Sequence, residues 1–293
     1  MSPSEPGSQR VQPTETGSSV TRGRSLVPPT AVVATLYKHW SLVYQLTRRN
    51  VVGRYRGSVL GLAWSLFYPV LMLSVYTFVF GVVFRSRWSS TEQSTWEFAT
   101  VLFVGIIVHG FFAECIVRSS GLIVGNSQYV KKVVFPLEIL PWVTVFSALF
   151  HASISILVLL VFYLLVSATL HWTVILVPAV LLPMVILAAG VSWCISSIAV
   201  YVRDVSHIVG VIATVLLFTS PIFYPIEALP EAIRPYVYLN PLSFIVEQMR
   251  NVVIWGRLPD WIGLLIYLLI GSAAAWLSVI WFRKLRPGFA DVV

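Results

Sequence analysis

Residues 47–65 read TRRNVVGRYRGSVLGLAWS, and this stretch joins the most basic part of the chain to one of its most apolar parts. Four arginines fall within nine residues, and no further charged residue occurs between Gly57 and Arg85. A helix needs about 20 mostly apolar residues to cross a lipid bilayer. The stretch therefore predicts a membrane-spanning helix that begins just after a basic segment.

The composition predicts that lipid surrounds much of the chain. Of the 293 residues, 57% are hydrophobic and only 11% are charged, whereas a soluble domain carries about 25% charged residues. The net charge of +8 is therefore interpreted by position and not as a nucleic-acid footprint. Cys115 and Cys194 lie in apolar runs without a CxxC pair, so we expect small buried residues and neither metal ligands nor a disulfide.

Six apolar segments are long enough to span a membrane, which predicts an all-α integral membrane fold. They cover about 60–84, 98–117, 140–167, 173–200, 207–225 and 261–282, and prolines close the fifth. With the N-terminus inside, fifteen of the twenty Lys and Arg residues fall in inner segments and five in outer ones. Positive residues collect on the cytoplasmic side, so both termini are predicted to be inside.

The first 59 residues divide into two parts ahead of the predicted membrane domain, 60–285. Residues 1–30 are polar and form a flexible cytoplasmic tail, because they lack the apolar run of a signal peptide. Residues 31–59 predict an amphipathic helix at the membrane interface. Its basic face includes Lys38, Arg48, Arg49 and Arg56, opposite an apolar side that includes Leu36, Trp40, Val43, Tyr44, Val51 and Tyr55; His39, Asn50 and Arg54 break the pattern.

This basic face has two interpretations. It either anchors the chain to anionic headgroups, or it also docks on an acidic partner protein. Composition alone favours plain anchoring, which needs no partner. Residues 286–293 are predicted to form a short cytoplasmic tail in either case.

Three connecting segments are unusual. The inner loop 119–139 is too apolar for a solvated connector and contains Lys131 and Lys132. The inner loop 201–207 is minimal and carries the adjacent pair Arg203–Asp204, which alone signals little more than a helix terminus. The outer region 226–256 is amphipathic and rich in proline and aromatic residues, which favours two short re-entrant helices over a folded outer loop.

The motifs of an enzyme or an ion-coupled pump are missing. There is no GxxxxGK[ST] phosphate loop, no HExxH, no Ser/His/Asp arrangement and no metal-binding cluster in the sequence. Glu114 is the one carboxylate within a predicted span, and Arg118 follows four residues later, which favours a helix pair over a proton relay. His109 and His151 stand alone in apolar spans and are predicted to be packing residues. We therefore expect a transport protein without catalytic residues of its own.

Four segments resemble the membrane subunits of type-2 ABC exporters for bacterial polysaccharides, and most of all the O-antigen type among the O-antigen, capsule and teichoic-acid permeases. They are RRNVVGRYRGSVLGLAWSLFYPVLMLSVYTFVFGVVF (49–84), GNSQYVKKVVFPLEILP (125–141), YVRDVSHIVGVIATVLLFTSPIFYP (201–225) and YLNPLSFIVEQMRNVVIWG (238–256). The resemblance extends from about residue 36 to residue 285.

The resemblance implies a permease of the bacterial inner membrane, made of two copies of the chain with two copies of a separate ABC ATPase subunit. ATP and Mg²⁺ would bind to that subunit, and this chain would hold no cofactor. The cargo would be a lipid-linked polysaccharide that moves from cytoplasm to periplasm. The basic helix and the two inner loops would couple to the ATPase through Arg48, Arg49, Arg56, Lys131, Lys132, Arg203 and Asp204.

The resemblance also implies that the first and fifth spans line a conduit. Aromatic residues there offer a surface on which sugar rings slide, although interface belts and core packing also use such residues. The candidates are Trp64, Phe67, Tyr68, Tyr76, Phe218, Phe223 and Tyr224, and Pro241, Glu247 and Arg250 mark the re-entrant region. An exporter of drugs or small lipids is the alternative in the same class. An integral-membrane enzyme or assembly protein for cell-wall glycans is the alternative in a different class.

Overall fold

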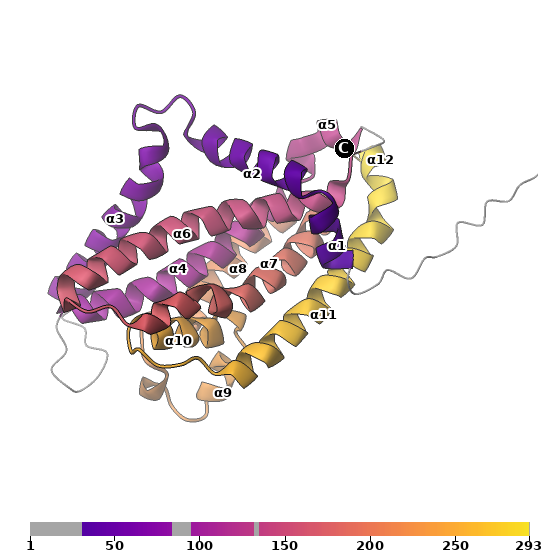
Figure 1. Ribbon diagram of the computed structural model, residues 1–293. Helices are drawn as coiled ribbons and strands as arrows, with labels where there is room; N and C mark the ends of the chain where they lie inside the picture. Colours follow the sequence, from indigo (N-terminus) through magenta and orange to yellow (C-terminus); the bar gives the residue numbers. More distant parts are fainter. Residues whose placement is uncertain (1–30, 84–94, 132–134, 293) are drawn as a thin grey trace, which may run out of the picture.

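The computed structural model describes residues 31–83, 95–131 and 135–292, and every regular element in these ranges is a helix. The predicted tail 1–30 and Lys132 lie outside the described residues. Figure 1 shows the long helices side by side in a bundle, with α2 running across one end of it.

Five helical segments in the described ranges are long and apolar enough to cross a membrane, and they agree with five of the six predicted spans. They cover Gly61–Val83, Trp96–Ser120, Leu137–Ser167, Trp172–Ala199 and Trp261–Val292. Their main elements are α3 (Trp64–Tyr76) with the π-helical η2 (Thr77–Val83), α4 (Thr95–Ser120), α6 (Leu140–Ser167), α7 (Val177–Ala199) and α11 (Trp261–Leu285).

The centre of the bundle is α4, which is the most buried of these five. It packs against α6, α7 and α8, whereas α11 packs mainly on α7. The approach of α7 to α11 depends on small residues: a Cβ at Gly190 would lie 2.7 Å from the Cα of Ala275. Small residues let two helix backbones come this close, as is common in membranes.

The predicted fifth span is shorter than the sequence indicates. Helix α8 (Val205–Thr219) has 15 residues and a length of about 22 Å, against about 30 Å of hydrocarbon. The helix ends at Thr219, six residues before the end of the predicted span 207–225, because Ser220 has extended backbone angles and Pro221 follows. Residues 220–225 continue as irregular chain.

The N-terminal segment forms two helices where one was predicted over residues 31–59. Helices α1 (Ala31–Lys38) and α2 (Trp40–Tyr55) meet at His39. Helix α2 ends at Tyr55, and Arg56 has extended backbone angles, so it does not continue the basic face. The chain then turns through Gly57 and Gly61, whose φ angles of +86° and +51° suit glycine and few other residues.

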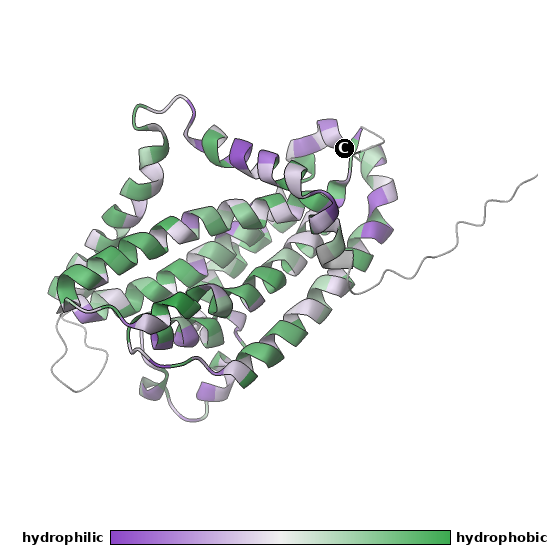
Figure 2. Cartoon of the chain, viewed as in Figure 1, coloured by the Kyte–Doolittle hydropathy of each residue, from purple (hydrophilic) through white to green (hydrophobic). Residues whose placement is uncertain are grey.

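The remaining short elements lie at the two ends of the bundle. They are η1 (Gly61–Ala63), η3 (Val124–Asn126), α5 (Ser127–Val130), η4 (Leu137–Ile139), η5 (Trp172–Leu176), η6 (Ile226–Ala228), α9 (Arg234–Val237), α10 (Pro241–Val253), η7 (Arg286–Gly288) and α12 (Phe289–Val292). Figures 1 and 2 show hydrophilic residues on α2, on α5 and around α12, and we call this end of the bundle the basic end. Hydrophilic residues also lie near α9, and we call that end the α9 end. The helices between the two ends are mainly hydrophobic (Figure 2).

Candidate functional site

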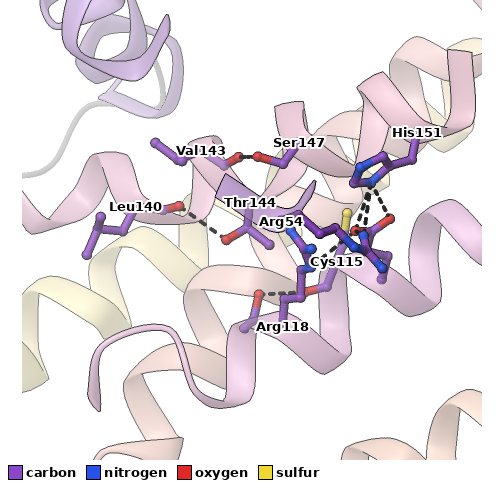
Figure 3. A network of polar contacts seen from close by, with 10 residues as sticks. Arg54, Cys115, Arg118, Leu140, Val143, Thr144, Ser147 and His151 are labelled. Carbon is purple, nitrogen blue, oxygen red and sulfur yellow. Dashed lines mark hydrogen bonds and ion pairs between the residues drawn. The ribbon is translucent and has the colours of Figure 1, made fainter. Parts of the chain in front are cut away.

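A cluster of charged side chains surrounds the carboxylate of Glu114 where α2 meets the helical bundle. Arg54 Nη1 donates to Glu114 Oε1 at 2.8 Å, and Arg118 Nε lies 3.1 Å from the same oxygen. His151 Nδ1 lies 3.0 Å from both carboxylate oxygens. Figure 3 shows Arg54, Arg118 and His151 converging on this point. The predicted Glu114–Arg118 pair is confirmed, but it is only part of a larger group.

Three helices supply the cluster. Glu114 and Arg118 are one turn apart on α4, which places them on the same face. Helix α6 runs antiparallel to α4 and brings His151 beside them, and the last turn of α2 brings Arg54. The prediction that His151 is an isolated packing residue is therefore wrong. His109 does fit that prediction, because its Nε2 contacts the backbone oxygen of Ala213 at 2.9 Å.

A cavity of about 920 Å³ opens next to this cluster, between the end of α2 and helices α3, α4 and α6. The cluster forms its charged side, with Tyr55 and Ser58 nearby. The remaining wall is mostly apolar and aromatic, and includes Trp64, Tyr68, Met72, Tyr76, Phe103, Ile107 and Phe111. Partial burial raises the pKa of Tyr55, so its hydroxyl stays neutral at physiological pH.

The aromatic residues predicted to line a conduit fall into two groups. Trp64, Tyr68 and Tyr76 line the cavity, whereas Phe67 is exposed and makes an edge contact with Trp64, with ring centres 5.4 Å apart. Phe218 on α8 and Phe223 in the irregular chain after α8 do not line it.

A row of rings connects these two groups. Tyr76 is 6.5 Å from Phe80, Phe80 stacks on Phe223 at 5.5 Å, and Phe223 stacks on Phe218 at 5.8 Å. Tyr224 donates its hydroxyl to the backbone oxygen of Phe218 at 3.1 Å. Ring contacts thus join η2, the end of the first apolar segment, to the irregular chain that follows α8. The connecting ring, Phe80, was missed, although it lies in the same apolar run as Tyr76.

At the basic end, Arg49 links α2 to α5. Its Nη2 donates to the hydroxyl of Tyr129 at 2.7 Å, and its guanidinium lies 5.9 Å from the centre of that ring. Tyr129 in turn stacks on Phe135 at 4.4 Å. Part of the predicted coupling surface is therefore held together within the chain.

The other predicted coupling residues that the structure describes are exposed. Arg48, Arg56 and Lys131 point to solvent, and so do Arg203 and Asp204 in the turn before α8. Asp204 occupies the N-cap position of α8, but its side chain makes no capping hydrogen bond. The side chain therefore does not act as a helix cap, and its carboxylate is available to a partner.

A second buried carboxylate, Glu138, ties the first inner loop to the C-terminal end of α11. Arg286 Nη1 donates to Glu138 Oε1 at 2.9 Å, and Arg283 Nε lies 3.7 Å away. Arg286 also donates to the backbone oxygen of Phe135 at 3.3 Å. Glu138 and Arg286 are 148 positions apart, and no sequence pattern predicts a contact over such a separation.

Near the α9 end, Arg250 on α10 is almost fully buried, with 3% of its surface exposed. Its guanidinium donates to the backbone oxygens of Val101, Pro221 and Ile222 at 3.1, 2.7 and 3.1 Å. Arg250 therefore does not belong with the exposed outer charges among which the sequence placed it. It satisfies carbonyls of the irregular chain that follows α8.

Two further residues of this region have separate roles. Pro241 is the first residue of α10 and its backbone oxygen accepts a hydrogen bond from Tyr267 at 2.9 Å. Glu247 is half-buried, and its burial, with the nearby charge of Glu227, raises the pKa of its carboxyl.

The described residues contain no group of three or more His, Cys, Asp or Glu side chains that could hold a metal ion. Cys115 is buried and Cys194 is half-buried, and both are free thiols.

Comparisons with known proteins show which family the chain resembles. The family model for the ABC-2 type transporter matches residues 41–254. The chain is 28% identical to the O-antigen export system permease protein RfbA of Myxococcus xanthus over 89% of this chain and 99% of that protein. It is 27% identical to the RfbA permease of Klebsiella pneumoniae over 87% and 95%, and 22% identical to the polysialic acid transport protein KpsM of Escherichia coli over 74% and 81%.

Proposed function

This chain belongs to the ABC-2 type transporter family and is a multi-pass protein of the bacterial inner membrane. We propose that it is the membrane subunit of an ATP-driven exporter of a lipid-linked polysaccharide. The relatives that match most of its length are named for O-antigen export and polysialic acid transport. A polysaccharide is therefore the cargo that the similarity supports.

The observation that carries the proposal is the row of rings Tyr76, Phe80, Phe223 and Phe218. Aromatic rings present flat apolar faces, on which sugar C–H groups stack with little directional preference. A polymer can slide along such a surface without breaking a fixed set of hydrogen bonds at each step.

A second copy of the chain would complete the conduit. Large apolar side chains stay exposed on α3 and on α8, among them Phe67, Val70, Val211, Val215 and Phe218. Exposed apolar surface of this extent faces either lipid or another protein. Tyr76 on α3 and Phe218 on α8 are the two ends of the ring row, so a two-fold pairing of these helices would enclose the row between the copies.

Two copies of an ABC ATPase subunit would supply the energy, with ATP and Mg²⁺ bound to them. Docking at the basic end is supported by the exposed charges Arg48, Lys131, Arg203 and Asp204, which come from three separate parts of the chain. Under this proposal six segments cross the membrane, with α8 and residues 220–225 forming the fifth, and the region 226–256 re-enters from the periplasmic side.

The two alternatives are less well supported. An exporter of drugs or small lipids would have the same architecture, but it would not need an extended row of rings. A glycan enzyme would need a reactive carboxylate at the cavity, and Glu114 is already bound by two arginines and a histidine.

Deletion of the gene from its native bacterium tests the proposal. We expect the surface polysaccharide to disappear and lipid-linked polymer to accumulate inside, and the wild-type gene to restore export. Phe80→Ala and Phe223→Ala should restore it poorly, whereas Trp281→Leu, which changes an exposed ring on α11 away from the row, should restore it fully. Unchanged surface polysaccharide in the deletion strain would refute the proposal. If the deletion strain were also more sensitive to drugs, the drug exporter would be favoured.

A further inference from the structure

The charged cluster beside the cavity carries more positive than negative groups. Arg54 and Arg118 share the single carboxylate of Glu114, and His151 lies against it as well. One guanidinium charge is therefore left without a counter-charge in the cluster. The side chains of Arg54 and Arg118 are 47% and 32% exposed, so a ligand that enters the cavity can reach both guanidinium groups.

The donors of the cluster are only partly used. Within the described part of the chain, hydrogen bonds and ion pairs involve Nη1 of Arg54 and Nε of Arg118, while both side chains line the cavity. Nε2 of His151 is buried and has no hydrogen-bond partner among the residues described. Because this atom is buried and Nδ1 faces the carboxylate, His151 supports Glu114 and leaves the contacts with a ligand to the two arginines.

The shape of the cavity indicates what kind of ligand fits. Its volume of about 920 Å³ is far larger than a free phosphate needs and lies within the range of sites for lipid-sized or drug-sized molecules. One side offers guanidinium groups, which bind phosphate in a bidentate manner. The remainder is apolar and aromatic, with Met72, Phe103 and Ile107 in the wall, and suits a hydrocarbon chain or a sugar.

The position of the site along the helices suits a lipid headgroup. Arg118 is in the last turn of α4 and Arg54 is in the last turn of α2. The cluster thus lies toward the end of the membrane segment, where α2 meets the bundle (Figure 1). Basic pockets between membrane helices on the cytoplasmic side are known binding places for anionic headgroups.

We propose that this cavity binds the phosphate group of a membrane lipid, with Arg54 and Arg118 contacting the phosphate and the aromatic wall contacting the adjoining part of the molecule. Glu114 holds the two arginines in place and lowers the net charge, so that the site accepts one phosphate ester and releases it again. The inference rests on the cavity and does not depend on the cargo being a polysaccharide.

Binding to the purified chain in detergent, followed by native mass spectrometry, tests this. Four probes are titrated: a polyprenyl phosphate, the polyprenol with the same chain, phosphatidylglycerol and inorganic phosphate. We expect the polyprenyl phosphate, phosphatidylglycerol or both to bind at least about tenfold more tightly than the polyprenol and than inorganic phosphate, because charged hydrogen bonds and the apolar wall both contribute. Which of the two lipids binds more tightly identifies the source of the phosphate.

The variants separate binding from structural support. Arg54→Gln and Arg118→Gln should each weaken binding of the preferred lipid by about tenfold. Glu114→Gln should keep or increase the affinity, since it removes the competing carboxylate. Lys38→Gln is the matched control: it removes one positive charge from an exposed residue of α1 and should leave binding unchanged.

Size-exclusion profiles show which variants are folded, and Arg118→Lys, which keeps the charge, replaces Arg118→Gln if the latter is not. Three outcomes would overturn the proposal: equal affinity for the polyprenol and its phosphate, binding of inorganic phosphate as tightly as of either lipid, or loss of binding in Glu114→Gln while Arg54→Gln and Arg118→Gln bind normally.

Discussion

Arg250 shows how one side chain allows an irregular chain segment inside a membrane bundle. Lipid offers no hydrogen bonds, so every backbone carbonyl there needs a protein partner. Arg250 supplies three donors in one planar group to the oxygens of Val101, Pro221 and Ile222. Asn240 assists, since its Nδ2 lies 2.9 Å from the hydroxyl of Ser220. The two residues together close the C-terminal end of α8.

Arg250→Lys is predicted to destabilise the protein although it keeps the charge. An ammonium group cannot reach three carbonyls in the plane of a guanidinium, and each hydrogen bond lost to a charged donor costs about 1.5–3 kcal/mol. We expect a lower midpoint of thermal unfolding in detergent and lower yield from the membrane. Arg257→Lys, an exposed arginine near the same end, is the control. An unchanged unfolding midpoint for Arg250→Lys would show that the clamp is dispensable.

Sequence reasoning at the residue scale succeeded where partners are close in sequence. Glu114 and Arg118 are four positions apart, and helical periodicity predicts their contact. His151 and Arg54 are 37 and 60 positions from Glu114, and periodicity says nothing about such distances. Arg54 lies off the basic face of its own helix, and this position was the one feature of the sequence that indicated a different role for it.

At the scale of elements, helix α2 is more than a basic anchor. Its buried residues are Val43, Leu46 and Val51, and Trp40 meets Phe146 on α6 edge-on at 5.6 Å. The side chain of Arg54 continues this inward-facing side. Of the predicted apolar arc, Val43 and Val51 pack on the bundle, whereas Trp40 and Tyr44 keep more than half of their surface exposed.

Arg49 is predicted to serve the ATPase interface through its guanidinium. Arg48→Lys combined with Arg49→Lys keeps the charge but removes the planar forks that pair with carboxylates. We expect normal membrane insertion, poor export and weaker recovery of the ATPase subunit on pull-down. Export and pull-down at wild-type levels would show that the basic face only anchors the chain to the membrane.

Tyr129→Phe is the matched control for Arg49. It removes the hydroxyl that accepts from Arg49 while the ring remains to stack on Phe135. If Arg49 acts on the partner, Tyr129→Phe should export normally, because an exposed hydrogen bond of this kind contributes little. A defect in Tyr129→Phe equal to that of the lysine variant would show that Arg49 serves only to hold α5.

Asp204→Ala is predicted to impair coupling without affecting insertion or stability. The side chain is exposed and makes no capping hydrogen bond to α8, so its removal should leave the unfolding midpoint unchanged. We expect reduced export, and ATP hydrolysis by the assembled transporter that no longer depends on cargo. A fall in the unfolding midpoint together with normal export would instead assign Asp204 to the helix terminus.

For the whole molecule, the sequence predicted the long helices well and α8 poorly. Length and hydropathy are sufficient to predict a helix that is longer than the bilayer is thick. The end of α8 is instead set by hydrogen bonds from Asn240 and Arg250, which lie in a later segment. The direction of the helices nevertheless confirms that the chain turns back between α7 and α11. These two helices run parallel, since Gly271 lies against Pro183, Ala275 against Gly190, and Leu285 against Tyr201.

Two parallel helices that start from the same side of the membrane require an odd number of crossings between them, and we propose that α8 with residues 220–225 is that crossing. The basic end and the α9 end would then face opposite sides of the membrane. Because Lys and Arg collect on the cytoplasmic side, the basic end is predicted to face the cytoplasm.

Single cysteines in a background without Cys115 and Cys194 test this orientation. A cysteine at Pro230, exposed beside α9, should react with a membrane-impermeant maleimide in intact spheroplasts. A cysteine at Ser206, exposed in the first turn of α8, should react only after the membrane is opened. The sequence also predicts labelling from outside at Ser89, which lies beyond the described residues. Labelling of Ser206 in intact spheroplasts would reverse the orientation, and labelling of both Pro230 and Ser206 from one side would mean that α8 does not cross the membrane.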